Sequence, residues 1–101
     1  MTLPLHPDAA LELEAATEWY ASEDRELAAR FVAEVRLRSA QADAFPRSGP
    51  RVIGLGERFD VRAFGLRSFP FRLVVATIRG ARIVVAIAHT SRHPHYWRPR
   101  L

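Results

Sequence analysis

Two nearly continuous apolar runs, separated by one Arg-Gly pair, constrain the fold of this chain more than any other feature. The runs, 71–78 and 81–88, are rich in Val and Ile, which pack well on a pleated sheet. Gly80 supplies the positive φ that a two-residue turn needs, so we expect an antiparallel hairpin. Because both runs are apolar along their length, both faces should be covered and both strands should be central ones.

Two amphipathic helices are expected before this hairpin. Asp8 can cap a first helix that starts just after Pro7, and the acids of 22–24 suit the start of a second helix, which Pro46 ends. The predicted apolar stripe of the first helix is Leu11, Ala15, Ala16, Trp19 and Tyr20. The stripe of the second is Leu27, Ala28, Phe31, Val32 and Val35, running on toward Ala42 and Phe45. Because few residues separate them, the helices should lie antiparallel.

The remaining segments predict a short strand, a loop and a third long strand. Thr2–Leu5 can form an edge strand, 47–58 is rich in Gly and Pro and should be a loop, and Phe59–Phe64 alternates weakly. Helices followed by strands indicate an α+β domain, with a helical hairpin on one face of a small antiparallel or mixed sheet of three or four strands. We expect residues 1–101 to form this single domain.

Charge is distributed unevenly along the chain. Residues 1–61 carry eleven acids and seven arginines, a net charge of −4, whereas residues 62–101 carry eight arginines and no acid, a net charge of +8. All fifteen basic residues are arginine. Such a one-sided field favours an anionic partner for the C-terminal half: a nucleic acid, an acidic protein segment, or the acidic helices of the chain itself.

Composition also predicts where the protein acts. It has no cysteine, hence no disulfide framework and no thiolate metal site, which is typical of an intracellular protein. No apolar run approaches the ~20 residues of a membrane span. The first twenty residues hold four carboxylates and no Lys or Arg, which argues against a secretory signal. We therefore expect a cytoplasmic protein with no membrane association.

Motifs along the chain resemble the ParE/RelE superfamily of type II toxin proteins, and the ParE side more closely. They comprise an Ala-rich first helix ending in Trp19-Tyr20, Leu27-Ala28-x-x-Phe31, Pro46, the run FPFRLVV from Phe69, and IVVAIAHxxRxPxYWxxR from Ile83. The resemblance implies a small cytoplasmic toxin that a ParD-like antitoxin holds inactive in a hetero-oligomer. ParE members are associated with poisoning DNA gyrase, whereas RelE members cut mRNA in the ribosome.

The RelE-like alternative would make the protein an endoribonuclease. Cleavage through the 2′-hydroxyl needs a base, cations for the phosphate charge and an acid for the leaving oxygen. The candidates are Arg72, His89, Arg92 and Tyr96. The lysines of RelE-like sequences would fall on Ala63 and Gly65, and nearby guanidiniums are poor proton acceptors, which leaves His89 as the base. We therefore favour a binding toxin and assign no catalytic residue.

The hairpin register bears on this alternative. With a two-residue turn, Ile78 faces Ala81 and Arg72 faces Ile87, so that His89 lies diagonally from Arg72 on the same sheet face. A three-residue turn would place the two on opposite faces.

For the favoured reading, the basic and aromatic tail should bind gyrase. The predicted target-binding residues are Arg92, Tyr96, Trp97, Arg98 and Arg100. Tyr96-Trp97 can alternatively pack the tail onto the domain. The antitoxin should cover apolar surface along the helical hairpin and pair acids with Arg62, Arg67 or Arg72.

Neither a cofactor nor a metal is expected. His89, His93 and His95 could be drawn as a metal site, but the tail supplies no carboxylate. A plain nucleic-acid-binding module is a third possibility, since the basic field is present, but no helix-turn-helix or base-stacking strand motif accompanies it.

Overall fold

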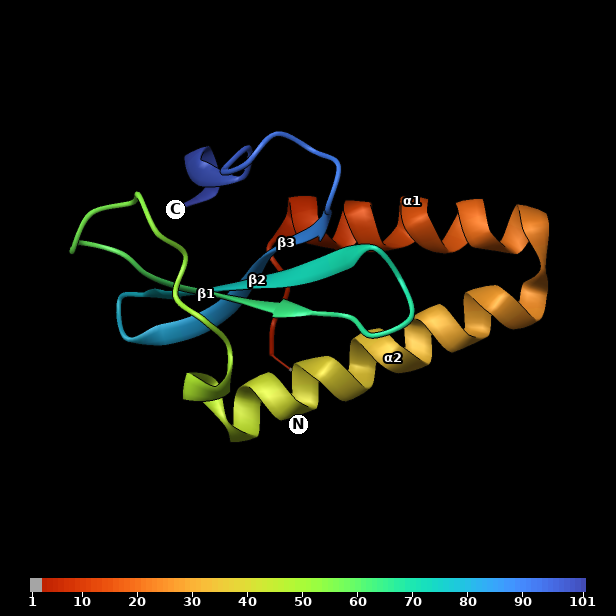
Figure 1. Ribbon diagram of the computed structural model, residues 1–101, viewed down its shortest axis with the longest axis horizontal. Coiled ribbons are helices and arrows are strands. Elements are labelled where there is room, and N and C mark those ends of the chain that lie inside the picture. The colour runs from red at the N-terminus through yellow and green to blue at the C-terminus, as the bar shows by residue number, and fades with distance from the viewer. Residues whose placement is uncertain (1–2) are drawn as a thin grey trace.

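The computed structural model describes residues 3–101 and shows two helices followed by a three-stranded antiparallel sheet (Figure 1). The elements are α1 (Pro7–Glu23), α2 (Arg25–Ala44), the 3-10 turn η1 (Pro46–Ser48), β1 (Asp60–Gly65), β2 (Phe71–Ile78), β3 (Ala81–His89) and the 3-10 turn η2 (Arg98–Arg100). The predicted α+β class and the antiparallel helical hairpin are confirmed.

The sheet has the order β1-β2-β3, so only β2 is a central strand. Arg79 and Gly80 have φ values of 52° and 80° and Ile78 pairs with Ala81, which confirms the two-residue turn. The prediction that both strands are central was wrong for β3, although both faces of β3 are covered. The N-terminal segment lies along the outer edge of β3, where Leu5 forms a parallel bridge with Val84. This single bridge replaces the predicted strand 2–5, of which Thr2 lies outside the described residues.

A β-bulge at Val85 separates two stretches of regular pairing between β2 and β3. Val75 pairs with Val84 but Val74 pairs with Ala86, so Val85 is the extra residue. Arg72 therefore faces Ala88 and not Ile87, and His89 faces Phe71. The prediction that Arg72 and His89 share a face was wrong, because the bulge shifts the alternation of side chains by one residue.

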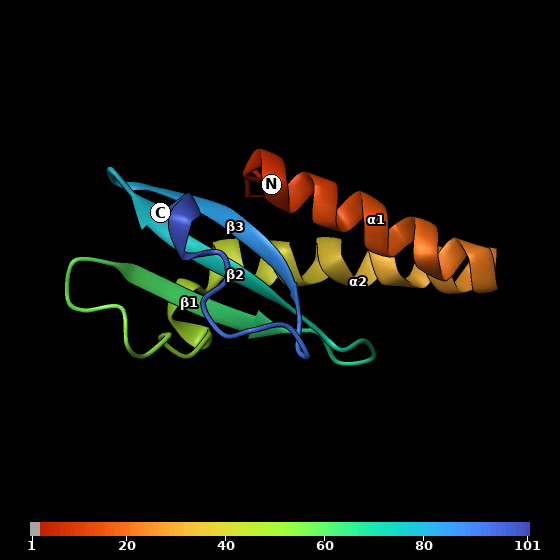
Figure 2. The same ribbon diagram turned by 90° about the horizontal axis from the view of Figure 1, so that it is seen from above.

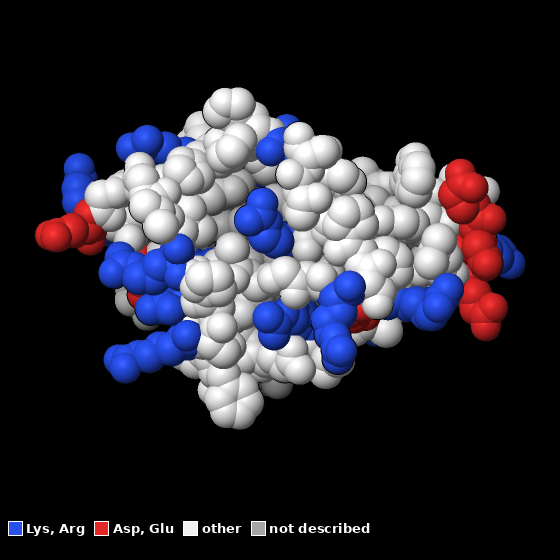
Figure 3. Space-filling model, in the orientation of Figure 1, with Lys and Arg blue, Asp and Glu red and all other residues white. Residues whose placement is uncertain are grey.

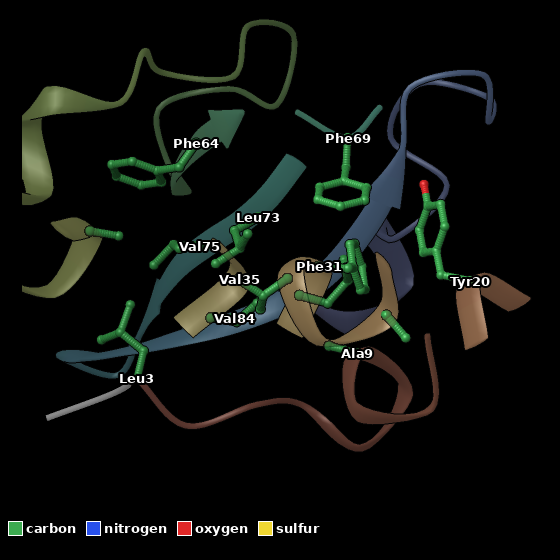
Figure 4. Packing of buried hydrophobic residues seen from close by; sticks show 13 residues of the cluster. Leu3, Ala9, Tyr20, Phe31, Val35, Phe64, Phe69, Leu73, Val75 and Val84 are labelled. Carbon is green, nitrogen blue, oxygen red and sulfur yellow. The ribbon is translucent and has the colours of Figure 1, made fainter. Parts of the chain in front are cut away.

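The helical hairpin packs on one face of the sheet and encloses an aromatic core (Figures 2 and 4). Phe31 is fully buried, and its ring lies 5.0–5.2 Å from the rings of Tyr20, Phe69 and Phe71. Leu73, Val75, Val84 and Ile87 supply the sheet side of this core. We call this side of the sheet the helix face.

The apolar stripe of α1 differs from the predicted one. The residues that turn inward are Ala9, Leu13, Ala16 and Tyr20. Leu11 and Trp19 are 63% and 62% exposed, and Phe45, just after α2, is 66% exposed. Ala15 is exposed as well, so these four were wrongly assigned to the packing stripes. The cap of α1 is His6, whose Nδ1 accepts from the Asp8 amide, so the prediction of Asp8 as the cap was wrong. Asp24 caps α2, within the segment 22–24 whose acids were expected at the start of that helix.

The opposite side of the sheet is covered by the loop before β1 and by the end of the chain. Small side chains of β2 and β3 lie there, and the cluster that covers them includes Leu55 and Trp97. We call this side the tail face, and residues 90–101 the C-terminal tail. The tail crosses back over the sheet on the side opposite α2 (Figures 1 and 2).

Candidate functional site

The C-terminal tail is folded onto the sheet. Trp97 is only 4% exposed and packs among the apolar residues of the tail face. The Thr90 amide donates to the Pro70 carbonyl at 2.9 Å, and the turn η2 closes the chain. The burial of Trp97 agrees with the packing role weighed for Tyr96-Trp97, so in this conformation Trp97 is not presented to a target.

One carboxylate on α1, that of Glu12, accepts hydrogen bonds from three side chains of the tail. Glu12 accepts from the Tyr96 hydroxyl at 2.6 Å and from both terminal nitrogens of Arg100 at 2.9 and 3.0 Å. Burial, and then the hydrogen bond and charge of Glu12, raise the pKa of Tyr96 to about 12. The hydrogen bond to Glu12 likewise raises the pKa of Arg100. Both side chains, which are protonated at neutral pH in any case, therefore keep their protons to a higher pH than usual.

Two arginines of the tail, Arg92 and Arg98, are exposed. The Arg92 side chain is 52% exposed, its guanidinium carbon lies 3.7 Å above the Tyr96 ring centroid, and its contact with Glu12 is 3.4 Å long. Arg98 is also exposed, and within residues 3–101 no carboxylate lies within 4.0 Å of it. Of the five predicted target-binding residues, these two offer charge to a partner without rearrangement of the tail.

The four residues of the nuclease alternative line one small hollow of about 120 Å³ at the end of the sheet. Arg72 reaches it from the tail face, while His89, Arg92 and Tyr96 reach it from the end of β3 and from the tail. Three of them have other partners, since Arg92 also contacts Glu12, at 3.4 Å. The Tyr96 hydroxyl donates to Glu12, and Nδ1 of His89 accepts from the Ser91 amide at 3.0 Å. The sheet and the tail thus bring these four residues together, but several of their polar groups are already hydrogen-bonded to other residues.

An apolar groove of about 360 Å³ lies between α1 and the end of β3. Its walls are Ala15, Ala16, Trp19, Tyr20, Phe71, Ile87 and His89, with Glu12 and Arg92 at one end. We call it the α1–β3 groove. His89 and Arg92 also line the hollow just described, so these two side chains form the wall between the two depressions.

The three arginines predicted to meet an antitoxin lie in different places. Arg72 is exposed at the end of β2, and Arg67 lies in the β1–β2 turn, where its amide donates to Glu34. Arg62 lies on the helix face beyond the end of α2, where its guanidinium donates to the Gly49 carbonyl and lies near Asp60. They do not form one patch.

Arg62 shares its surroundings with two further arginines. A hollow of about 460 Å³ is lined by Arg47, Arg62 and Arg82, over a floor that includes Val75 and Thr77. Arg82 donates to the carbonyls of Ala42 and Asp43 and pairs with the Asp43 carboxylate at 2.9 Å. This satisfies carbonyls at the negative end of the α2 dipole. Arg82 therefore has a structural role there.

The charge distribution follows the two halves of the sequence. In Figure 3 the acidic side chains of the visible face gather mainly at the end of the molecule formed by the α1–α2 turn, and arginines are spread over the sheet and its far end. The expected contrast is thus maintained in space. The exceptions include Glu12 and Asp43, whose carboxylates pair with Arg100 and Arg82 of the C-terminal half.

Sequence reasoning missed Glu12, Arg47 and Arg82 as site residues. Glu12 resembles its exposed neighbours Glu14 and Glu18 in the sequence, and only its place beside the inward-facing Leu13 could have marked it. Arg82 could have been noticed as a lone charge in an apolar strand.

Comparisons with known proteins complete this description. Residues 3–94 match the family model described as the ParE toxin of the type II toxin–antitoxin system, parDE. No curated protein matches the sequence. Within residues 3–101, no helix has the length and hydropathy needed to cross a membrane, and no group of three or more His, Asp or Glu side chains could hold a metal ion.

Proposed function

Because the chain belongs to the ParE toxin family of type II toxin–antitoxin systems, we propose that it inhibits DNA gyrase by binding and that a cognate ParD-like antitoxin neutralises it. The proposed setting is the cytoplasm, with the single domain 1–101 acting in a hetero-oligomer with the antitoxin. The family match supports a toxin of this class, and the identity of the target rests on the resemblance to ParE rather than RelE.

The observation that carries the proposal is the docked, acid-free tail with outward guanidiniums. Arg92 and Arg98 are exposed on a segment whose path is fixed by the buried Trp97. Fixed cationic side chains recognise a macromolecular surface at a lower entropy cost than mobile ones. Tyr96, Trp97 and Arg100, which we also proposed for target binding, act in the free protein by holding this segment.

The antitoxin is proposed to cover apolar surface on the helical hairpin. Leu11 and Trp19 are exposed on α1, and Trp19 borders the α1–β3 groove. Exposed apolar stripes beside a groove are typical of protein interfaces. Carboxylates of the same antitoxin would pair with Arg62, Arg67 or Arg72, which lie in three separate places and therefore require a partner that extends over the toxin.

A RelE-like endoribonuclease is the second candidate, because Arg72, His89, Arg92 and Tyr96 line one hollow. Against it, a Tyr96 pKa of about 12 makes the hydroxyl a poor proton donor or acceptor at neutral pH, and this hydroxyl is already bonded to Glu12. We therefore rank binding above catalysis.

Induction of the protein without an antitoxin separates the two candidates. Gyrase-trapped DNA breaks with intact mRNA would support gyrase inhibition, and Arg92→Gln combined with Arg98→Gln should abolish them. Arg25→Gln, an exposed arginine at the start of α2, is the matched control. Codon-phased mRNA cuts that disappear in His89→Ala or Arg72→Ala would establish the nuclease instead. Unimpaired growth would contradict both.

A further inference from the structure

The carboxylate of Glu12 accepts more polar contacts than it has lone-pair sites. Its side chain is 15% exposed, and it accepts five contacts. Oε1 accepts from the Ile87 amide at 3.0 Å and from Arg100 Nη1, while Oε2 accepts from Tyr96, from Arg100 Nη2 and, at 3.4 Å, from Arg92. A carboxylate offers about four lone-pair sites, so the fifth and longest contact, that of Arg92, is the weakest.

The same set of contacts closes the edge of β3 with side chains. Ile87 and Val85 present an amide and a carbonyl away from β2, and Glu12 and Arg100 bond to them at 3.0 and 2.9 Å. Earlier along β3, the backbone of residues 4–6 bonds to Val84. Exposed edge groups are otherwise a template for unwanted strand pairing. Glu12 and Arg100 thus act where a neighbouring strand would have acted.

Loss of Glu12 would leave Arg100, a poorly exposed charge of the tail, without its main acidic partner. Arg100 is 15% exposed at its side chain, and its other acidic neighbour, Asp8, is 54% exposed and 3.6 Å away. Removing one member of a buried ion pair leaves a charge without compensation, which costs more than the pair itself contributed. Arg100 and Tyr96 would then gain by moving into water.

We propose that Glu12 is the positioning residue of the C-terminal tail: through Tyr96 and Arg100 it fixes the tail on the sheet and thereby sets where Arg92 and Arg98 are presented. Glu12 contacts no target in this arrangement. It acts through the tail, and its removal should release the tail while the helix face stays folded. The consequence for toxicity rests on the proposed function, but the structural consequence does not.

The chain allows both effects to be observed separately. It has two tryptophans and two tyrosines, and one of each lies in the tail. In a Trp19→Phe/Tyr20→Phe background, Trp97 is the sole tryptophan and Tyr96 the sole tyrosine. Acrylamide quenching then reports on docking of the tail, and tyrosinate absorbance reports on the contact between Tyr96 and Glu12. Far-UV circular dichroism monitors the helices.

In this background we expect Glu12→Ala to raise the Trp97 quenching constant severalfold and to move the Tyr96 midpoint from about 12 toward its ordinary value of 10, with the helical signal retained. Glu12→Gln, which keeps one acceptor oxygen, should give an intermediate result. Glu14→Gln, an exposed glutamate on the same helix, should change neither. A purely global destabilisation would not move the Tyr96 midpoint while leaving the helices intact.

A Trp97 that stays protected in Glu12→Ala would overturn the proposal whatever the Tyr96 midpoint, because the loss of Glu12 lowers the pKa of Tyr96 even in a docked tail. If Glu12→Ala does not fold, hydrogen exchange of Glu12→Gln decides: faster exchange confined to 90–101 supports the proposal, and uniform acceleration overturns it. Growth assays keep the two hypotheses apart. A wild-type protein that does not inhibit growth contradicts the proposed function, whereas the fluorescence result still decides the role of Glu12.

Discussion

The two faces of the sheet are covered in different ways. The helix face is filled by interlocking aromatic rings around Phe31, contributed by both helices and the sheet. The tail face has small residues of the strands under one tryptophan, and its cover is tied down by Glu12 and Arg100. Buried apolar side chains carry no charge that titrates, whereas a charge network responds to pH and is weakened by salt screening. One face is therefore the scaffold, and the other can respond to its surroundings.

Phe31→Ala is expected to have the largest effect. It removes a fully buried ring from the centre of the helix face, which should lower the free energy of unfolding by about 4 kcal/mol. Urea unfolding followed by circular dichroism measures this change. Phe45→Ala, at an exposed position, is the control and should stay within about 0.5 kcal/mol of the wild type. Equal losses of unfolding free energy in Phe31→Ala and Phe45→Ala would contradict the view that the helix face is the scaffold.

Trp97→Ala tests the tail face. Loss of this buried side chain should lower the free energy of unfolding by about 2 kcal/mol, because only one layer of apolar residues is uncovered. Hydrogen exchange should accelerate over residues 90–101 and on the tail face, with α1 and α2 unchanged. Trp19→Ala, where the indole is exposed, should have little effect on stability. If Trp97→Ala also accelerated exchange in both helices, the two faces would form one cooperative unit.

High pH should release the tail before it unfolds the helices. The pKa of Tyr96 is raised in the folded protein, so its contribution to stability is complete below pH 10 and is lost as the pH rises toward about 12. In a Trp19→Phe/Tyr20→Phe background, Trp97 quenching should increase over this range while the helical signal persists. Tyr20 must be replaced because burial raises its pKa as well. Adding Tyr96→Phe should abolish the step, and a step that survives would assign it to another group.

Arg92→Gln should have the smallest effect on stability and a large effect on function. Its ion pair with Glu12 is long and exposed, so the free energy of unfolding should change by less than about 1 kcal/mol. Growth inhibition should nevertheless weaken strongly, because Arg92 is one of two outward guanidiniums of the tail. Thermal unfolding and a growth assay are compared, with Arg25→Gln as the control. Full toxicity of Arg92→Gln would exclude Arg92 from the target contact.

Much of the fold could be predicted from the sequence because its signals are local. The Arg79-Gly80 turn, the start of α2 after the acids of 22–24 and the stop at Pro46 each depend on a few neighbouring residues, and all three were correct. The stripe of α1 was shifted because alanine is ambiguous. Leu11 and Trp19 suggested one face of the helix, whereas Ala9 and Leu13, which the predicted stripe left out, lie on the face that packs.

The arrangement of the site depends on contacts between distant residues, and these leave no local signal. Glu12 and Arg100 are 88 positions apart, and nothing in either sequence neighbourhood indicates that they pair. The bulge occurs within Val84-Val85-Ala86 without a glycine to mark it, so the register was predicted as regular and His89 was placed on the wrong face. The tail residues were identified from the sequence, but the sequence did not indicate that Trp97 and Arg100 are the ones that pack inward.

The bulge at Val85 has a consequence for how the chain can vary in length. Along β3, Val84 is bonded to residues 4–6 and Ile87 to Glu12, and both attachments come from the start of the chain. The distance from Val84 to Ile87 along β3 must therefore match the distance from residues 4–6 to Glu12. Removing Val85 would shorten the former by up to about 3.3 Å. An insertion or deletion in one segment thus requires a compensating change in the other, although some seventy residues separate them.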